Sequence, residues 1–170
     1  MGDLTSYDVN QIHERLLFEK SNNIHRGLYH RLQIDFAYNS NHIEGSRLSH
    51  DQTRYIFETN SIILESGQKN LMIDDIIETV NHFACFDLIL ENATDKLTED
   101  FIKQLHYTLK RGTSYSRKPW FNIGDYKQLP NEVGGNTTTS FGNCAKRNQT
   151  FIKEIQSNKK CIIYNTVRFS

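Results

Sequence analysis

The residues best suited to chemistry lie in the segment from Tyr38 to Leu48, which carries a serine and a glutamate four positions apart. On a helix this spacing places the side chains of Ser40 and Glu44 on one face, about one turn apart. Gly45 follows directly, and a glycine after the last turn lets the chain leave a helix sharply. A carboxylate at this end of a helix lies at the negative pole of the helix dipole and therefore favours a cationic partner.

A second candidate region follows Gly112, where the helical period of the apolar residues disappears. The segment Gly124-Asp125-Tyr126-Lys127 and the later pair Gly134-Gly135 are typical of turns between extended segments. We expect a small β-hairpin between about Phe121 and Gly135.

The histidines do not form a recognisable site. His82 and His106 fall within helical patterns, so we expect them to be packed or partly exposed rather than catalytic. His13 is followed by Glu14, but neither this pair nor His42 has the spacing of a zinc-binding helix. The sequence also lacks a glycine loop of the kinds that bind nucleotide phosphates. We therefore predict no metal site.

The composition narrows the class of protein and its surroundings. The cysteines, Cys85, Cys144 and Cys161, are odd in number and lack a metal-binding spacing, which is typical of reduced cytoplasmic thiols. No secretory signal is visible, and the apolar runs are too short to span a bilayer. The 20 basic residues balance the 20 acidic residues, so bulk charge does not favour nucleic acid or a membrane surface. We expect a cytoplasmic protein with neither as a partner.

Apolar residues recur at helical spacing up to Gly112, which predicts a mainly α fold. Ser49 and Gln52 form a capping-box pattern, and Thr98 precedes two acidic residues that suit the start of a helix. The predicted helices cover residues 8–20, 24–45, 49–60, about 72–84 and 98–111. Beyond Thr139 the pattern weakens to a faint helical stripe at 151–155 and a faint strand at 161–164. The length of 170 residues favours one domain.

Taken in order, these segments resemble the Fic family of protein AMP-transferases. The inhibitory motif of that family is Ser or Thr, three residues, Glu and then Gly or Asn at the end of an N-terminal helix, which Ser40, Glu44 and Gly45 match. The run 75–84, the helix that opens at Thr98 and the segments 124–127 and 133–135 are similar to the family's succession. Lys127 stands where the family usually has Arg. The resemblance covers about residues 10–139.

The resemblance implies a Fic-like helical domain, here incomplete, with a small β-hairpin flap. It divides the chain into N-terminal helices with the inhibitory motif (1–60), the first part of the Fic core with the flap (61–139) and a divergent tail (140–170). In the family the flap aligns a target segment by strand-like pairing. The flap residues of this sequence are Gly124, Asp125, Tyr126, Lys127, Gly134 and Gly135.

Family members transfer AMP from ATP to a Ser, Thr or Tyr hydroxyl of a target protein. In their motif His-x-Phe-x-(Asp/Glu)-Gly-Asn-Gly-Arg-x-x-Arg, the histidine is the base, the acidic residue holds Mg²⁺, and the inhibitory glutamate pairs with the last arginine. The chain lacks this motif; its segment 141–147 shares only Gly142-Asn143 and the basic pair Lys146-Arg147. We therefore expect no catalytic residue, metal or cofactor here, whereas the intact family uses ATP and Mg²⁺.

Three interpretations follow. In the first, the chain is an inactive N-terminal part of an autoinhibited AMP-transferase. A shifted reading frame beyond Thr139 would explain the tail, because A/T-rich codons read one base downstream yield a helical pattern ending in Asp-Phe-His. In the second, the chain is a binding module that lends its inhibitory helix in trans to an intact Fic partner. In the third, it is a structural helical domain with a chance motif. The partner is accordingly a target protein or an intact Fic protein.

Overall fold

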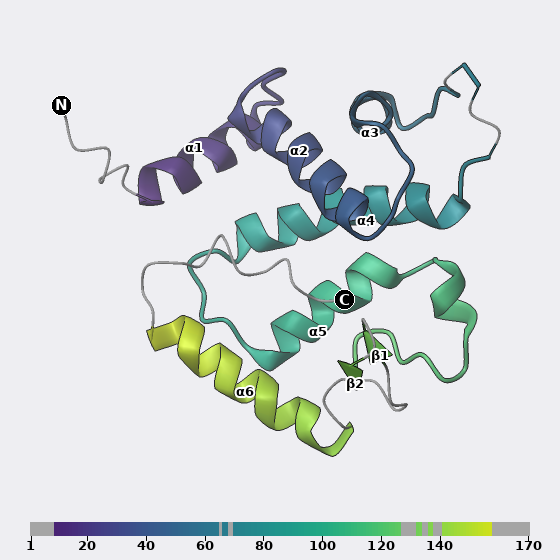
Figure 1. The fold of residues 1–170 in the computed structure, drawn as a ribbon. Coiled ribbons are helices and arrows are strands. Elements are labelled where there is room, and N and C mark those ends of the chain that lie inside the picture. The colour runs from purple at the N-terminus through teal and green to yellow at the C-terminus, as the bar shows by residue number, and fades with distance from the viewer. Residues whose placement is uncertain are drawn as a thin grey trace. The chain divides into compact units, whose positions relative to one another are not determined.

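The computed structural model describes residues 9–64, 66–67, 70–126, 132–133, 136–137 and 141–157. These residues are mainly helical, as predicted (Figure 1). The helices are α1 (Val9–Ser21), α2 (Leu28–Ile43), α3 (His50–Thr59), α4 (Ile73–Glu91), α5 (Glu99–Lys110), the 3₁₀ helix η1 (Ser114–Arg117) and α6 (Phe141–Ser157). The chain divides into two compact units, Met1–Asp95 (unit 1) and Lys96–Ser170 (unit 2). Unit 1 includes α4, which packs with α1, α2 and α3.

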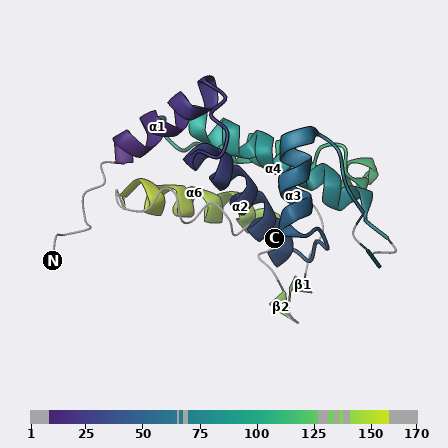
Figure 2. The same ribbon diagram turned by 90° about the horizontal axis from the view of Figure 1, so that it is seen from above.

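Helix α2 is central to unit 1, since it packs against α1, α3 and α4. Figure 2 shows α1 and α3 on opposite sides of α2. The buried apolar side chains of this unit are Leu16, Ile34, Ala37, Leu48, Ile56, Cys85 and Leu90. Polar side chains are equally deep, and Gln33, Thr53 and Thr79 are almost completely inaccessible. Buried polar groups of this kind need hydrogen bonds inside the protein.

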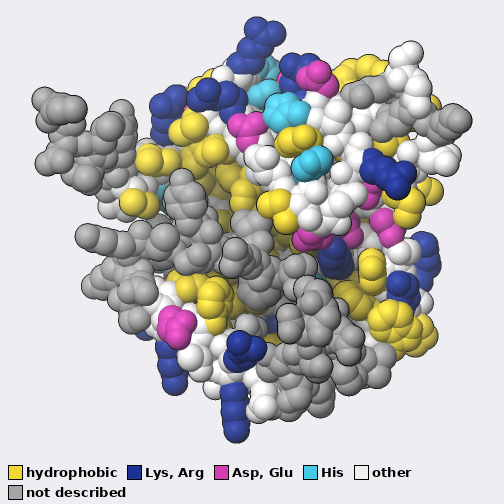
Figure 3. Space-filling model, viewed as in Figure 1, with side chains coloured by type: hydrophobic (Ala, Val, Ile, Leu, Met, Phe, Trp, Pro, Cys, Tyr) yellow, Lys and Arg dark blue, Asp and Glu magenta, His cyan; other side chains and the backbone are white. Residues whose placement is uncertain are grey.

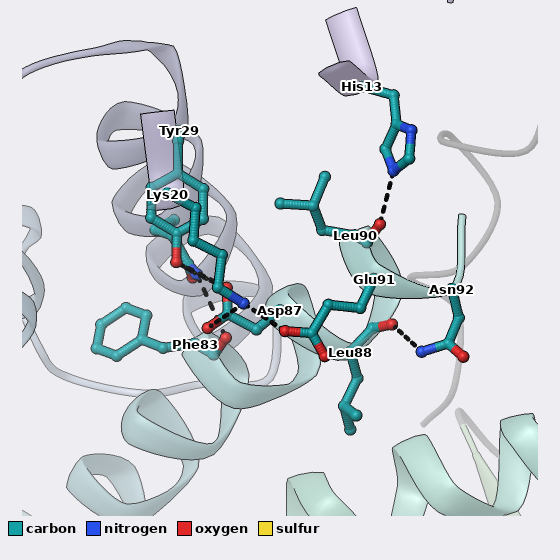
Figure 4. Close-up of polar contacts among 10 residues, drawn as sticks. His13, Lys20, Tyr29, Phe83, Asp87, Leu88, Leu90, Glu91 and Asn92 are labelled. Carbon is teal, nitrogen blue, oxygen red and sulfur yellow. Dashed lines mark hydrogen bonds and ion pairs between the residues drawn. The ribbon is translucent and has the colours of Figure 1, made fainter. Parts of the chain in front are cut away.

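A polar network joins α1, α2 and α4 (Figure 4). The hydroxyl of Tyr29 and the side-chain amide of Gln33 both donate to Asp87 Oδ1, at 2.7 Å and 2.9 Å. From α1, Lys20 Nζ lies 3.2 Å from Asp87 Oδ2 and 2.6 Å from Glu91 Oε1. Burial and the neighbouring Asp87 carboxylate raise the pKa of Tyr29. One carboxylate of α4 thus binds side chains from both other helices.

A second carboxylate, from α1, holds the start of α2. Glu19 is only 5% exposed, and its two oxygens accept hydrogen bonds from Arg15 Nε and from the Tyr29 amide, both at 2.8 Å. These bonds hold the pKa of Glu19 below its usual range. The first amides of a helix lack intrahelical partners, so the carboxylate stabilises this end. Gly27 leaves room for it, because a Cβ at Gly27 would overlap Glu19 Oε2 and lie 2.8 Å from Glu19 Cδ.

The start of α2 differs from the prediction. The sequence predicts a helix from Ile24, whereas α2 begins at Leu28. Asn23 and Arg26 adopt positive φ angles of 50° and 63°, which are incompatible with a right-handed helix. The chain therefore turns twice before the helix begins.

The tail also differs from the prediction. The sequence predicts only a faint helical stripe beyond Thr139, whereas α6 spans 17 residues. Ile152 is buried, α6 packs against α5, and the side-chain amide of Gln156 donates to Leu97 O at 2.9 Å. These contacts with the start of unit 2 stabilise a helix that the local pattern only weakly indicates.

The predicted hairpin between Phe121 and Gly135 is not seen. Residues 121–126 form turns. Among the residues that the structure describes, the paired strands are β1 (Glu132–Val133) and β2 (Asn136–Thr137), which run antiparallel. Side chains of α5 hold residues 124–126 in a turn, which prevents them from extending into a strand. Lys127, Gly134 and Gly135 lie outside the described residues.

Replacing Gly27 with alanine should lower the free energy of unfolding of unit 1 by about 1–3 kcal/mol, the usual cost of leaving buried polar groups without partners. The backbone of Gly27, with φ −74° and ψ −175°, suits alanine. The loss should therefore come from displacement of the Glu19 carboxylate. Urea unfolding followed by far-ultraviolet circular dichroism measures it.

Glu19→Ala supplies the matched control. In that background the new methyl group meets no carboxylate, so the additional cost of Gly27→Ala should fall close to zero in a double-mutant cycle. An equal cost in both backgrounds would contradict the role of Glu19 at the start of α2.

Candidate functional site

The structure places Ser40, Glu44 and Gly45 together at the C-terminal end of α2. Glu44 is the C-cap residue and is exposed, whereas Ser40 is buried. Gly45 has a φ of 94°. Its amide donates to His42 O at 3.1 Å, and the Ser46 amide donates to Asn41 O at 2.9 Å. These two bonds form a Schellman motif, which turns the chain away from the helix directly after the glutamate.

The end of α2 is anchored on α4. The side-chain amide of Asn41 donates to Thr79 Oγ1 at 2.8 Å in a buried contact, and the Thr79 hydroxyl donates to Asp75 O at 2.8 Å. Beyond the bend, the Arg47 amide donates to Asp75 Oδ2 at 3.3 Å. Both sides of the bend are therefore fixed to the same stretch of α4. Sequence reasoning missed Asn41, since nothing local distinguishes a buried asparagine from an exposed one.

Burial separates the roles available to Ser40 and Glu44. The Glu44 amide donates to Ser40 O at 3.3 Å, so the two residues lie one helical turn apart. Ser40 is 5% exposed and packs within unit 1. Glu44 presents a carboxylate to the surface at the negative end of the helix, where a cation would bind favourably.

In unit 2 the described flap residues form a turn held by α5. The amide of Gly124 donates to His106 Nδ1 at 3.1 Å. Asp125 Oδ1 lies 3.0 Å from Lys103 Nζ, and the same ammonium lies 4.7 Å from the centre of the Tyr126 ring. Gly124 has a φ of 78°, and a Cβ there would lie 2.9 Å from Tyr107 Cβ. Only glycine suits this position.

The charges around this turn support one another. The Tyr126 amide and Lys103 lower the pKa of Asp125, while the hydrogen bonds that Lys103 donates to Asp125 and Glu99 raise the pKa of Lys103. Burial, followed by the nearby Lys110, lowers the pKa of His106, so its ring is neutral at neutral pH and Nδ1 can accept the hydrogen bond from the Gly124 amide. The turn thus presents the exposed carboxylate of Asp125 and is held in place by side chains of α5.

Two contacts of this turn were not predicted. Sequence reasoning missed Lys103 and also Asn148 of α6, whose side chain donates to the Tyr126 hydroxyl at 3.2 Å. His106 is partly buried, as predicted for a packed residue, but it also binds the turn.

The remaining candidates do not assemble into a site. His82 is buried and lies edge-to-face with Phe36, as predicted for a packed residue. Residues 141–147 lie in α6 rather than in a loop. Among the described residues, no three His, Cys, Asp or Glu side chains gather in a way that could hold a metal ion. The helices of the described residues are also too short or too polar to cross a membrane.

A Fic domain-containing signaling protein from Bacteroides thetaiotaomicron has a similar solved structure, with a TM-score of 0.60 and 23% sequence identity. The similarity covers 84% of this chain and 55% of that protein. The chain has a Fic-like fold. It spans only slightly more than half of the length of this structural relative. No family model matches the chain, and no curated protein matches its sequence. At this level of sequence identity, the similarity to the Fic protein supports a shared fold and nothing further.

Lowering the pH should loosen the turn at Gly124. Because the pKa of folded His106 is lowered, its contribution to stability is fully present above the ordinary histidine pKa of about 6.5 and is lost as the pH falls from there through the folded value. Protonation also removes the Nδ1 acceptor. The protection factor of the Gly124 amide, measured by hydrogen exchange between about pH 8 and pH 5, should therefore decrease.

His106→Gln is the control for this titration. Glutamine does not titrate, so the pH step in Gly124 protection should disappear in this variant. A step of unchanged size in His106→Gln, or a constant protection factor in the wild type, would contradict the role of His106.

Proposed function

We propose that this chain is the N-terminal, regulatory part of an autoinhibited Fic-family protein adenylyltransferase, an enzyme that transfers AMP from ATP to hydroxyl groups of target proteins. The observation that carries the proposal is the position of Glu44, an exposed carboxylate at the end of a helix whose last turn is anchored on α4. The Fic-like fold and the match of Ser40, Glu44 and Gly45 to the inhibitory motif support it.

In this proposal Glu44 pairs with the arginine of the catalytic motif that would otherwise bind the triphosphate of ATP. The motif does not occur in the sequence, so this arginine lies outside these 170 residues. A carboxylate at a helix C-terminus is disfavoured by up to about 1 kcal/mol, which increases its preference for a cation. Asn41 and Thr79 position the carboxylate by holding the last turn of α2.

The described residues do not fit Mg²⁺ and ATP as the family binds them. Gly142 and Asn143 lie in the first turn of α6, but Phe141 stands where the motif has its acidic residue and Cys144 where it has its second glycine. The part of the chain that the structure describes also lacks a cluster of carboxylates for the metal. We therefore derive no catalytic step for this chain and propose that it transfers no AMP by itself.

A second candidate function is inhibition in trans. Unit 1 has its own core and carries the complete Ser40–Gly45 segment. Such a unit can present Glu44 to a separate Fic protein without help from unit 2. In this case the chain is a binding module, and its partner is an intact Fic protein.

Incubation of the chain with ATP labelled at the α-phosphate should label neither the chain nor proteins of a cell lysate. Glu44→Gly should not change this result, because the base, the metal ligand and the arginines that bind phosphate are missing together. Electrophoresis with autoradiography measures the transfer. Label on any protein above the no-chain control would show that the chain is itself a transferase.

The role of Glu44 is tested with a catalytic Fic core that lacks its own inhibitory helix. The chain should reduce label incorporation by this core, and Glu44→Gln should abolish the reduction, because glutamine keeps the size but not the charge. Glu14→Gln, at an exposed glutamate of α1, is the matched control and should inhibit like the wild type. Equal inhibition by Glu44→Gln and wild type would contradict the proposal.

The same assay separates the two candidate functions. Inhibition only when the chain is fused to the core supports a regulatory part that acts within one protein. Inhibition by the separately added chain supports the module that acts in trans.

A further inference from the structure

A hollow between α2 and α3 gathers cationic side chains at the end of α2 opposite Glu44. It has a volume of about 560 Å³, and its lining includes Arg26, Arg31 and Arg54. Figure 3 shows histidine side chains, with Lys and Arg beside them, on this face over α2 and α3. A hollow of this size lies within the range of small-molecule sites. The sequence motifs and the proposed function do not use it.

The arginines supply permanent positive charge. Arg26 and Arg31 are exposed, and guanidinium groups stay protonated at physiological pH. Arg54 lies 3.0 Å from Asp51, but the Asp51 side chain is 77% exposed. An exposed contact of this kind contributes little, so Arg54 can turn towards a ligand.

Two carboxylates in the lining are already bound by histidines. Glu58 Oε1 lies 3.1 Å from His30 Nε2, and Asp35 Oδ1 lies 2.8 Å from His50 Nε2. Both pairs join α2 to α3 across the hollow. The three guanidinium groups outnumber the two carboxylates, so the lining favours an anion.

The walls of the hollow are preorganised. His30 is 8% exposed, and its ring lies edge-to-face with Phe57 at 5.3 Å between centroids. Arg26 is held at a φ of 63°, a left-handed conformation that is uncommon for a residue with a Cβ. Backbone conformations of this kind concentrate at binding sites. A second hollow of about 420 Å³ adjoins the first and shares Arg26, His30 and Glu58 with it.

We propose that this hollow binds a dianionic phosphate group, either as free phosphate or as part of a small phosphomonoester. Guanidinium groups offer paired N–H donors whose geometry matches phosphate oxygens. Ile34 is the one aliphatic side chain among the described lining residues, so an apolar ligand would be a poor fit. The site is separate from Glu44, and its existence does not depend on the proposed function.

The direct test titrates the purified chain with inorganic phosphate and with O-phosphoserine, with sodium chloride used to keep the ionic strength constant. Isothermal titration calorimetry should show saturable binding, and the ring proton signals of His30 and His50 should shift with it in NMR spectra. Tighter binding of phosphoserine indicates a phosphomonoester as the source, and tighter binding of phosphate indicates the free ion. Binding of neither probe, or shifts no larger than those with chloride, would overturn the proposal.

A double variant tests the arginines. Arg31→Gln combined with Arg54→Gln should weaken binding roughly tenfold or more, because two charge-assisted contacts are lost. Arg117→Gln, at an exposed arginine of η1, is the matched control and should bind like the wild type. Full binding by the double variant, or equal loss in Arg117→Gln, would overturn the proposal.

Two further measurements keep the result decisive. Circular dichroism shows whether the double variant is folded; if it is not, the histidine shifts of the wild type remain the test. A poly-glutamate peptide that binds the wild type more tightly than both phosphate probes would assign the hollow to an acidic protein segment and overturn the phosphate proposal.

Discussion

The hydrogen bonds of the Glu19 carboxylate determine where α2 begins, and the other three helices of unit 1 pack against α2. Helix α2 has no side-chain cap of its own, because its N-cap residue is Gly27. The carboxylate from α1 supplies the missing acceptor, and the absence of a Cβ at Gly27 leaves space for it. Asp87 then fixes the orientation of α2 by binding Tyr29 and Gln33. The positions of both the Glu44 bend and the arginine hollow depend on this start.

The elements that could be predicted from sequence are those whose signals are local. Ser49 and Gln52 form the predicted capping box, Thr98 caps α5 as expected, and Gly45 ends α2. The start of α2 could not be predicted in the same way. Its cap is the carboxylate of Glu19, which accepts a hydrogen bond from the amide of Tyr29, ten positions later in the sequence. This contact exists only after α1 and α2 have packed.

In the candidate site, too, the local features could be predicted from the sequence and the long-range contacts could not. The Ser40–Gly45 bend was predictable, since it depends on residues within two helical turns. Its anchor was not, because Asn41 and Thr79 are separated by 38 positions. The sequence predicted a turn at Gly124 but not what holds it, because the side chains of His106 and Lys103 that bind it come from α5. The arginine hollow was missed for a similar reason, since its residues come from a loop and two helices.

The division into two units has a consequence for the order of events during synthesis. Helix α1 contacts the last turn of α4, where His13 Nε2 lies 2.8 Å from Leu90 O. Every element of unit 1 is therefore available once Asp95 has left the ribosome. N-terminal units generally fold first as a chain is made. The Glu44 carboxylate can then be fixed at its bend before α5 and the Gly124 turn have emerged from the ribosome. A nascent chain would thus carry the Glu44 carboxylate in place before unit 2 can fold.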